Sequence, residues 1–526
     1  MNSNQIPLIP PRTTEEFVTE IENLTEEIQQ LYCQDNTPWV IGFSGGKDSS
    51  AVLQLVWNAI AKLPLNQRHK KIYIITTDTL VENPIVAQWV KGCLKQIEMS
   101  AQQQQMPFEP HLLTPAIKNS FWVCLIGKGY PAPRHNFRWC TERMKIKPSD
   151  NFIKEKIRFH GEVLLALGTR KTESIARAKN MEKHAQKERL KERLNFNSSR
   201  RSYIYTPIED WRTDEVWLYL LQWDNPWGGD NQDLFTLYRG ATADNECPLV
   251  IDTSTPSCGD SRFGCWVCTM VSKDKSMEAM IQNDQDKDWL QPLLDLRNEL
   301  DIRDDRDKRD FRRLYGKVEL FERNNNGTTS IQPIPGPYLK KWREYWLTKV
   351  LEAQVNIQKN APEAFQNTQL ISIEELSEIR RIWLEEKHEF DDAVPRIYEQ
   401  VTAEKFSDPR IGADNHLLGS EEWEILEQIC EHDPMHLELV TRLLDVERQY
   451  TTKVRRVGIY KALEKCFTTS SRSQEEAIAN AHYIQEVKQA ALAGDVQGLQ
   501  QKLSWGDLKF SQQQNSIDNI ESDSSS

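Results

Sequence analysis

Short apolar runs alternate with longer amphipathic stretches between residues 39 and 221. The runs WVIGF, KIYIITTDTL and EVLLALG are rich in β-branched and aromatic residues, and each has the length of a buried strand. The stretches between them are long enough for helices. Strands that alternate with helices are typical of a parallel sheet with crossover helices. The pattern therefore predicts an α/β fold for this part of the chain.

The strand pattern fades after about residue 270, and helical spacing takes over. In EELSEIRRIWLEEKHEF, for example, four apolar residues fall on one helical face: Leu376, Ile379, Ile382 and Trp383. The second half of the chain is therefore predicted to be mainly α-helical. Two stretches have the polarity of exposed or mobile segments, namely residues 170–201 and the C-terminal FSQQQNSIDNIESDSSS, which is too poor in apolar residues to pack.

The composition excludes some classes of protein. The chain has 526 residues, with 66 Lys or Arg, 78 Asp or Glu and a formal net charge of −12. Proteins that coat nucleic acid are usually basic, so any contact with nucleic acid must be local. The sequence shows no charged leader with an apolar core and no run of about 18 apolar residues. We therefore expect a soluble, cytoplasmic protein of two or three domains.

The first apolar run leads through the sequence SGGKDSS into a helical pattern. Such a turn directs free backbone N–H groups of a helix N-terminus at a ligand, and these groups suit a phosphate. Gly45 and Gly46 would allow a tight turn and the close approach of an anion. The spacing differs from G-x-x-x-x-G-K-[ST], so transfer of a γ-phosphate is not indicated. By itself, the turn is more simply explained as an ordinary strand-to-helix connection.

Four stretches in the same order resemble the PP-loop family of ATP pyrophosphatases, which includes sulfonucleotide reductases and tRNA-thiolating enzymes. FSGGKDSSAVLQL resembles the PP-loop itself, and TTDTLVENP resembles the segment after the second strand. LGTRKTES resembles the arginine segment, and TPIEDWRTDEVWLYL resembles the helix start P-I-x-D-W-x-x-x-x-V-W. The matches extend from Phe43 to Leu220. The resemblance implies a parallel-sheet domain of the adenine nucleotide α-hydrolase type.

The resemblance also implies that ATP is cleaved between its α and β phosphates and that AMP is transferred to an oxygen of the substrate, which can then leave. The residues that match the loop would cradle the pyrophosphate: Ser44, Gly45, Gly46, Lys47, Asp48 and Ser49. Lys47, Asp48 and Arg170 are expected to be catalytic, and Lys171 would also offset phosphate charge. Asp78 lies at a predicted strand end and would position nucleotide or Mg²⁺. A turn-forming aspartate is an equally good explanation.

Ten cysteines in a cytoplasmic chain are not expected to form disulfides. Five lack ligand-like spacing and are predicted to be buried structural residues: Cys33, Cys93, Cys124, Cys430 and Cys466. Four others follow the pattern C-x10-C-x6-C-x2-C: Cys247, Cys258, Cys265 and Cys268. Four thiolates can hold either Zn²⁺ or an iron–sulfur cluster. Zinc sites more often show two C-x2-C pairs, so the single pair here favours iron and sulfur.

The remaining cysteine, Cys140, lies in the basic segment PRHNFRWCTERMKIKP. Five cations in this window outnumber the single acid Glu142: Arg134, Arg138, Arg143, Lys145 and Lys147. Nearby cations favour a thiolate, so Cys140 is predicted to be a nucleophile or a persulfide carrier. The alternative is a structural cysteine in a basic surface segment.

A more specific resemblance extends from about Thr37 to Tyr450. FRWCTERMKIKP, SRFGCWVCT, RDFRRLYGKVEL and IPGPYLKKWREYWL are similar to the DndC family of DNA phosphorothioation sulfurtransferases. The resemblance implies that ATP activates a backbone phosphate of DNA, and that sulfur from a cysteine desulfurase of the DndA or IscS type replaces a non-bridging oxygen. It also implies a [4Fe-4S] cluster on the four spaced cysteines, and partner proteins of the DndD and DndE types.

With these resemblances, the chain is expected to have five parts. They are a helical segment 1–36, a PP-loop domain 37–240, an iron–sulfur segment 241–270, a mainly helical domain 271–508 and a disordered tail 509–526. Two alternatives remain open: a PP-loop sulfonucleotide reductase or tRNA-thiolating enzyme, and a non-catalytic scaffold that senses ATP. The long helical half argues against a free sulfonucleotide as substrate, and the intact SGGKDS argues against a scaffold.

Contact with DNA would come from local basic patches. Residues 170–201 contain 11 Lys or Arg and 4 Asp or Glu, which gives a local charge of +7. Such a segment would bind phosphates with salt-sensitive affinity. A solvated helix with internal ion pairs is an equally good explanation. Further along the chain, only Arg309, Arg312 and Arg313 are candidates.

Overall fold

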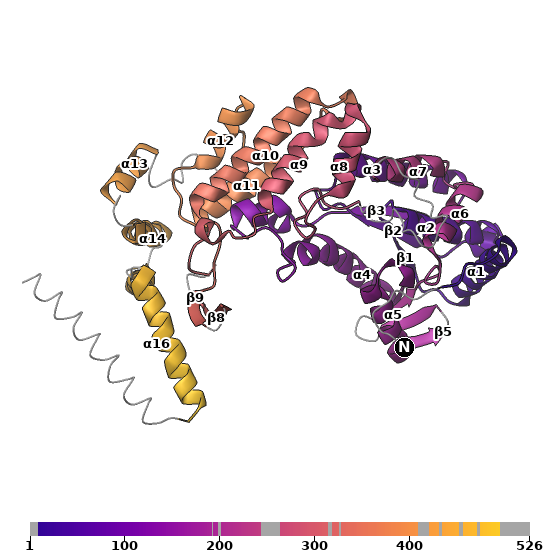
Figure 1. Ribbon diagram of the computed structural model, residues 1–526, viewed down its shortest axis with the longest axis horizontal. Helices are drawn as coiled ribbons and strands as arrows, with labels where there is room; N and C mark the ends of the chain where they lie inside the picture. The colour runs from indigo at the N-terminus through magenta and orange to yellow at the C-terminus, as the bar shows by residue number, and fades with distance from the viewer. Residues whose placement is uncertain are drawn as a thin grey trace, which may run out of the picture.

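The computed structural model describes residues 9–191, 193–197, 201–242, 263–313, 318–325, 328–408, 420–430, 434–451, 456–470 and 474–494. Figure 1 shows an α/β half followed by a helical half. The predicted tail 509–526 lies outside the described residues, and so do Cys247 and Cys258. Within the described ranges, none of the helices combines the length and the apolar character needed to cross a membrane.

A seven-stranded sheet forms the centre of the α/β half, in the order β3-β2-β1-β4-β7-β6-β5. The strands are β1 (Trp39–Gly42), β2 (Ile72–Thr77), β3 (Phe108–Leu113), β4 (Val163–Ala166), β5 (Arg189–Lys191), β6 (Leu194–Asn197) and β7 (Ser202–Tyr205). The first five strands in this order, β3, β2, β1, β4 and β7, pair in parallel. At the end of the sheet, β6 pairs antiparallel with β7 on one side and with β5 on the other. The predicted α/β fold with a mainly parallel sheet is therefore confirmed.

Alternate residues of the central strands face opposite layers of the α/β half, because side chains along a strand point to opposite sides of the sheet. Trp39 and Ile41 join the larger core. Val40, between them, packs with Tyr73 and Val163 on the other face. The sheet is thus buried on both faces, which explains the continuous apolar runs in the sequence.

Helices cover both faces of this sheet. The larger core contains residues of α1 (Thr14–Gln34), α2 (Lys47–Ala61), α3 (Pro84–Gln103), α6 (Thr213–Gln222) and α7 (Asn231–Gly240). The opposite face is covered by α4 (Lys147–His160), whose Phe152, Ile153 and Ile157 pack on the strands. A further helix, α5 (Ile175–Glu188), precedes the antiparallel strands (Figure 1).

Helices make up most of the second half, as predicted. They are α8 (Lys275–Asn283), α9 (Gln291–Leu300), α10 (Lys340–Asn360), α11 (Ile373–Arg381), α12 (Ala393–Thr402), α13 (Ser420–Ile429), α14 (Pro434–Thr451), α15 (Ile459–Ser470) and α16 (Gln474–Leu492). The four apolar residues assigned to one face, from Leu376 to Trp383, are all buried. One antiparallel hairpin, β8 (Leu320–Asn325) with β9 (Thr328–Pro333), was not predicted.

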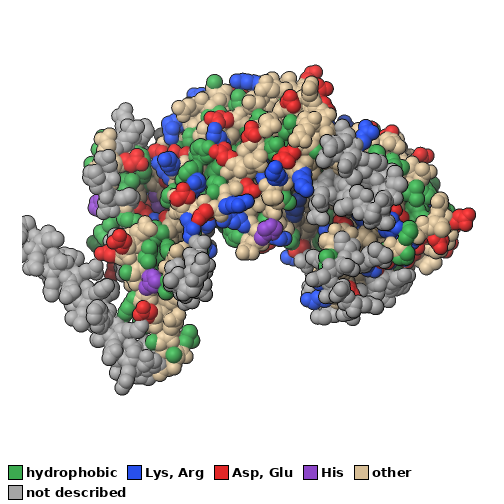
Figure 2. Space-filling model, in the orientation of Figure 1, with side chains coloured by type: hydrophobic (Ala, Val, Ile, Leu, Met, Phe, Trp, Pro, Cys, Tyr) green, Lys and Arg blue, Asp and Glu red, His purple; other side chains and the backbone are tan. Residues whose placement is uncertain are grey.

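The connection between β3 and α4 packs into the helical half. Trp122 and Met144 of this connection are buried in the same core as Trp346 and Trp383. The indole N–H of Trp122 donates to the carbonyl oxygen of Leu370 at 2.7 Å, and that of Trp383 donates to the carbonyl oxygen of Ile126 at 3.1 Å. The two halves are therefore held together through this connection. Figure 2 shows a hollow between the helical half and the α5/β5 end of the sheet, bordered by Lys and Arg side chains.

Two expectations about exposure are corrected. Cys33 is exposed, whereas the other four cysteines predicted to be structural are buried. The stretch 170–201 is not uniformly exposed, because Arg170 is only 2% exposed. Arg193 is also engaged, since its guanidinium forms ion pairs with Glu20 and Glu27 of α1.

Candidate functional site

The glycine turn connects the carboxyl end of β1 to α2. Gly45 has φ +72°, and a Cβ atom there would lie 2.6 Å from Cγ2 of Val90, so a glycine is required on both counts. The indole N–H of Trp89 donates to the carbonyl oxygen of Gly45 at 3.1 Å. Both neighbours belong to α3. The turn is therefore fixed by its packing on this helix.

Several backbone N–H groups of the turn are free to bind a ligand. Those of Gly45, Gly46, Asp48 and Ser49 form no hydrogen bond with any residue that the structure describes, whereas the N–H of Ser44 donates to Oγ of Ser49 at 3.2 Å. Gly46 is the N-cap of α2 and supplies no side chain to cap it. Free N–H groups at an uncapped helix N-terminus suit a phosphate. The turn therefore presents an anion-binding geometry.

A cavity of about 680 Å³ lies over this turn. Its lining includes every residue predicted to bind nucleotide, together with Arg170: Ser44, Gly45, Gly46, Lys47, Asp48, Ser49 and Asp78. Sites for small molecules commonly measure roughly 300–1,000 Å³. The cavity also opens at the carboxyl ends of parallel strands, where ligands of α/β sheets usually bind. Its size and place suit a nucleotide.

Arg170 holds the first turn of α2 at the cavity wall. Its Nε donates to Oδ1 of Asp48 at 2.7 Å, and its Nη1 donates to Oγ1 of Thr172 at 2.8 Å and to the carbonyl oxygen of Trp211 at 3.2 Å. Because protein groups take these donors, Arg170 positions Asp48. Lys47 lines the cavity with its Nζ 3.3 Å from Oδ2 of Asp48.

Two neighbouring charged residues have partners of their own. Nζ of Lys171 lies 3.0 Å from Oε1 of Glu209 and 2.8 Å from Oδ1 of Asp210, the two acids of the PIEDW motif. Asp78 follows β2 and accepts the N–H of Leu80 at 2.9 Å through Oδ1, while Nζ of Lys91 lies 3.5 Å from its Oδ2. Asp78 therefore shapes a turn and also faces the cavity.

Sequence reasoning missed three residues that shape this cavity. A Cβ atom on Gly168 would lie 2.7 Å from the carbonyl oxygen of Asp48, so only glycine lets the loop after β4 lie against α2. The hydroxyl of Tyr238 in α7 accepts the N–H of Lys47 at 3.4 Å, and Trp89 binds Gly45 as described above. Gly168 lies within the LGTRKTES stretch, so the resemblance of this stretch to the arginine segment could have identified it. No pattern in the sequence pointed to Tyr238 or Trp89.

Of the spaced cysteines, Cys265 contacts the wall of the cavity and shares a turn with Cys268. The N–H of Cys268 donates to the carbonyl oxygen of Cys265 at 3.1 Å, so the C-x2-C pair forms a tight turn. Sγ of Cys265 lies 3.3 Å from Oγ1 of Thr79 and 3.7 Å from Oε1 of Glu82. Glu82 in turn lines the cavity. The thiol of Cys265 is therefore separated from the cavity by one side chain.

Lys145 connects the cavity with the cysteines. It lines the cavity, and its Nζ lies 3.7 Å from Oε1 of Glu82. The pKa of Lys145 is raised, chiefly by the negative charge of a Cys265 thiolate, with Glu82, Cys268 and Cys140 adding to the effect and burial opposing it. Three thiols thus interact electrostatically with one ammonium group.

Cys140 does not have the acidic thiol that its basic window predicted. Burial raises the pKa of this thiol above its usual value. The cations of the window have other partners: Arg134 pairs with Asp305 (3.1 Å), Arg138 with His135 (3.3 Å), Arg143 with Asn119 (2.8 Å), Lys145 with Glu82 (3.7 Å) and Lys147 with Glu142 (3.2 Å). The predicted lowering of the pKa was wrong, because burial of the thiol has the largest effect and the cations pair with other groups.

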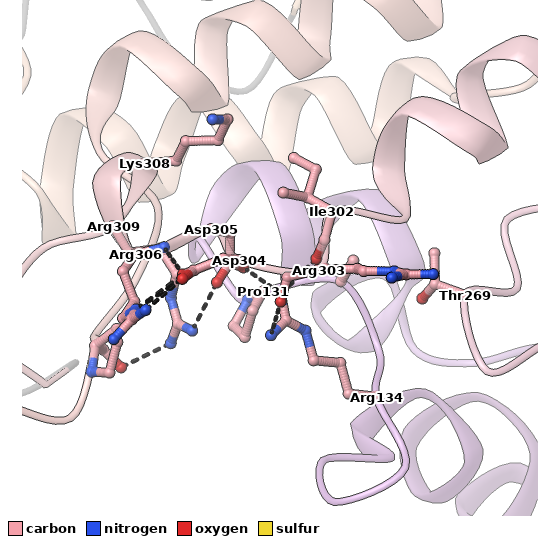
Figure 3. A network of polar contacts seen from close by, with 12 residues as sticks. Pro131, Arg134, Thr269, Ile302, Arg303, Asp304, Asp305, Arg306, Lys308 and Arg309 are labelled. Atoms are coloured by element: carbon pink, nitrogen blue, oxygen red, sulfur yellow. Dashed lines mark hydrogen bonds and ion pairs between the residues drawn. The ribbon is translucent and has the colours of Figure 1, made fainter. Parts of the chain in front are cut away.

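Arg134 anchors the Cys140 segment to the helical half, as Figure 3 shows. Its guanidinium donates to the carbonyl oxygen of Ile302 at 2.8 Å and pairs with Oδ2 of Asp305. Asp305 is buried and also accepts hydrogen bonds from Tyr338 (3.2 Å) and Arg309 (3.4 Å). Residues 135–138 lie between this anchor and Cys140, and they are exposed.

The described thiols fit part of the predicted iron–sulfur site. Cys265 and Cys268 share one turn, as C-x2-C ligands of metals do. Burial raises the pKa of Cys265 to about 12, so binding of a metal there would have to displace the proton. Within the described ranges, no group of three or more His, Cys, Asp or Glu side chains is arranged to hold a metal ion. The four-cysteine set stays a prediction.

Residues 38–228 match the family model of the phosphoadenosine phosphosulfate reductase domain. This range therefore forms a domain of that type, and it includes the glycine turn, Asp78 and Arg170. An uncharacterized protein of Methanocaldococcus jannaschii is 29% identical over 204 residues, which cover 38% of this chain and 35% of that protein. The match thus spans about a third of the length of this curated relative. The family match ends before Cys265 and before the helical half.

Proposed function

We propose that the chain is a sulfurtransferase of DNA phosphorothioate modification. Its phosphoadenosine phosphosulfate reductase-like domain belongs to a group that covers sulfonucleotide reductases and thiolating enzymes. The observation that carries the proposal is a shared wall: Glu82 and Lys145 line the nucleotide-sized cavity, Oε1 of Glu82 lies 3.7 Å from Sγ of Cys265, and the charge of Lys145 interacts with this thiol. A nucleotide in the cavity would therefore lie close to a thiol of the predicted sulfur-transfer site.

In the proposed first step, a non-bridging oxygen of a DNA phosphate attacks the α-phosphate of ATP, and pyrophosphate leaves. The free N–H groups of Gly45, Gly46 and Asp48 would stabilise the negative charge that develops on the leaving group. Lys47 would add a positive charge at the cavity wall. A magnesium ion near Asp78 would neutralise phosphate charge. The DNA phosphate then carries AMP as a leaving group.

In the proposed second step, the outer sulfur of a persulfide attacks the activated phosphorus and AMP leaves. Two electrons from an added thiol reductant then cleave the S–S bond, which restores the cysteine thiol and leaves the phosphorothioate on the DNA. A cysteine desulfurase of the DndA or IscS type would supply the sulfur, and Cys140 would carry it as a persulfide. Cys247, Cys258, Cys265 and Cys268 would hold a [4Fe-4S] cluster, which supplies electron-transfer chemistry when bound. Proteins of the DndD and DndE types would be further partners.

DNA would reach this site through the exposed loop 135–138, which precedes Cys140. Phe137 in this loop is 45% exposed, and among the described residues Arg138 forms hydrogen bonds with its neighbour His135 alone. The arginines that the sequence suggested are engaged within the protein: Arg309 with the carbonyl oxygen of Gly336 (2.7 Å), Arg312 with Asp310 (2.9 Å) and Arg313 with the carbonyl oxygen of Pro335 (3.1 Å). We therefore favour the loop beside Cys140 as the DNA contact.

The test is transfer of ³⁵S from labelled cysteine, through a cysteine desulfurase, to DNA. We expect label in DNA only when ATP is present, and none with the Cys140→Ser variant. The matched control is Cys33→Ser, because Cys33 is exposed on α1, outside the residues that line the cavity. Transfer to tRNA, or release of sulfite from a sulfonucleotide, in place of DNA labelling would support the alternative of a tRNA-thiolating enzyme or sulfonucleotide reductase.

A further inference from the structure

A second cavity, of about 670 Å³, lies in the helical half and shares no lining residue with the first. Residues of α9, α10 and α12 form its walls, and Ile302 and Lys308 complete the lining. Figure 3 shows the side chain of Lys308 turned away from the Arg134–Asp305 network. The reaction proposed above makes no use of this cavity.

Three aromatic side chains of α10 form one wall of this cavity. Trp342, Tyr345 and Trp346 lie three and four residues apart, so they share one face of the helix. The ring centroids of Trp342 and Tyr345 are 5.4 Å apart, and those of Tyr345 and Trp346 are 5.1 Å apart. Trp346 is buried, whereas Trp342 and Tyr345 are partly exposed. The ring planes of these pairs are 74° and 71° apart, so a planar ligand can stack on Trp342 and meet the ring of Tyr345 edge to face.

Positive charge gathers beside this wall. Lys341 and Arg396 line the cavity, and neither forms a hydrogen bond or an ion pair among the residues that the structure describes. They belong to two different helices, α10 and α12. The N-terminus of α10 has no side-chain cap and no acidic residue in its first turn, so its partial positive charge adds to that of Lys341. This end of the cavity suits an anion.

Two buried polar atoms at the cavity lack hydrogen-bond partners in the described part of the chain. They are Nε1 of Trp346, which is 1% exposed, and Oε1 of Glu344, which lies 3.9 Å from Nζ of Lys340 and also interacts with the charge of Arg396. Buried polar groups are nearly always paired in proteins, so such atoms call for a ligand or water. The indole N–H of Trp346 can donate to a ligand acceptor, and Oε1 of Glu344 can accept from a ligand donor.

We infer that this cavity binds one nucleotide unit, with its base against Trp342 and Tyr345 and its phosphate between Lys341 and Arg396. A nucleobase combines a planar ring with neighbouring donors and acceptors on one edge, and its phosphate supplies the anion. A purely acidic ligand would instead face the carboxylates of Glu299 and Glu344, which also line the cavity. The inference goes beyond the proposed function and does not depend on it. If DNA is the substrate, the nucleotide bound in this cavity is part of a DNA strand.

The test measures binding of two probes to the full-length protein. A fluorescein-labelled oligothymidylate, followed by anisotropy, represents a strand, and thymidine 5′-monophosphate, followed by tryptophan fluorescence, represents a free nucleotide. Trp342→Ala should weaken binding roughly 5- to 100-fold, because it removes one stacking platform. Trp342→Phe should restore most of the affinity, which distinguishes an absent stacking ring from misfolding.

A second pair of variants tests the phosphate position. Lys341→Gln combined with Arg396→Gln should weaken binding and lower the slope of log K against log salt by about 1 for each phosphate that the protein no longer neutralises. Lys359→Gln is the matched control, because it removes one charge at the other, exposed end of α10. If the substitutions weaken binding of the oligonucleotide alone, the site binds a nucleotide within a strand. If they weaken binding of both probes, the site also binds free nucleotides. Equal affinities for Trp342→Ala and the wild type would overturn the inference.

Release of AMP from ATP, measured in the same samples, separates this inference from the proposed function. Trp342→Ala should leave release of AMP without DNA unchanged, because the two cavities are distinct. A protein that binds oligonucleotide through Trp342 but releases no AMP would contradict the proposed function and support the nucleotide site. A protein that releases AMP but binds the oligonucleotide independently of Trp342 would contradict only the nucleotide site.

Discussion

Nε of Arg170 lies 2.7 Å from Oδ1 of Asp48, and this ion pair joins the loop after β4 to the first turn of α2. The side chain of Arg170 is 2% exposed and that of Asp48 is 18% exposed. The pair therefore lies in a largely desolvated setting, directly beside the free N–H groups of the glycine turn. The orientation of this turn depends on a contact between residues that are far apart in the sequence.

Replacement of Arg170 by Met should destabilise the protein by about 3–5 kcal/mol, because it removes the buried partner of the Asp48 carboxylate and leaves the longer ion pair with Lys47. The free energy of unfolding in urea measures the effect. We also expect ATP binding to be abolished, since the first turn of α2 would shift. Arg177→Met is the control for stability, because Arg177 pairs with Glu173 at the surface, and such a pair is worth less than about 1 kcal/mol. Equal destabilisation of the two variants would refute the special role of Arg170.

Gly168→Ala should destabilise the protein by about 1–3 kcal/mol and weaken ATP binding, because the added methyl group meets the backbone of Asp48 and Ser49. Thermal unfolding and nucleotide titration measure the two effects. Gly92→Ala is the matched control. Gly92 lies inside α3 with open space around its Cα, so this substitution should stabilise the helix by about 0.5–1 kcal/mol. A neutral Gly168→Ala would show that the close approach of the two backbones is not required.

The sequence predicted the strands that consist almost entirely of apolar residues. β1, β2 and β4 are buried on both faces and therefore appear as unbroken apolar runs. β3 was missed because it is an edge strand, where Glu109, Pro110 and His111 interrupt the apolar pattern. The β8–β9 hairpin was missed because its strands are polar, although an Asn-Gly pair lies between them in the sequence.

In the candidate site, too, the sequence predicted local features but not contacts between distant residues. The glycine turn is a local structure, so the residues that surround its ligand position could be read from one continuous stretch. The environment of Cys140 is not local, because Arg134 is drawn to Asp305 and Lys145 to Glu82. Tyr238 reaches the turn from α7 for the same reason. Counting charges in a sequence window therefore gave the wrong direction for the pKa of Cys140.

Cys265→Ser should abolish the brown colour and visible absorbance that we expect after anaerobic reconstitution with iron and sulfide, because the cluster would lose one of its four ligands. The absorption spectrum and the iron content per chain measure the effect. Cys33→Ser should leave both unchanged, since Cys33 is exposed on α1. Identical spectra for Cys265→Ser and the wild type would remove Cys265 from the ligand set.

Lys387→Met should stabilise the protein near pH 7, by an amount on the order of 3 kcal/mol. Burial lowers the pKa of Lys387 from 10.5 to about 8, with Arg343 adding to the effect. Between these two values the unfolded chain binds the proton that the folded protein has released, so the stability of the wild type rises with pH in this window. The advantage of Lys387→Met should therefore shrink as pH rises from 8 to 10.5. The free energies of unfolding of the variant and the wild type, measured across this pH range, give this advantage. A difference between the two proteins that does not change with pH would contradict the account.

The central claim is that the free N–H groups at Gly45, Gly46 and Asp48 hold the pyrophosphate that leaves ATP. The most direct measurement identifies the products of α-³²P-labelled ATP incubated with the reconstituted protein, with and without DNA. We predict labelled AMP, with one pyrophosphate released for each AMP, and neither product with Gly45→Ala, whose methyl group would lie 2.6 Å from Val90. Labelled ADP with inorganic phosphate would contradict the claim.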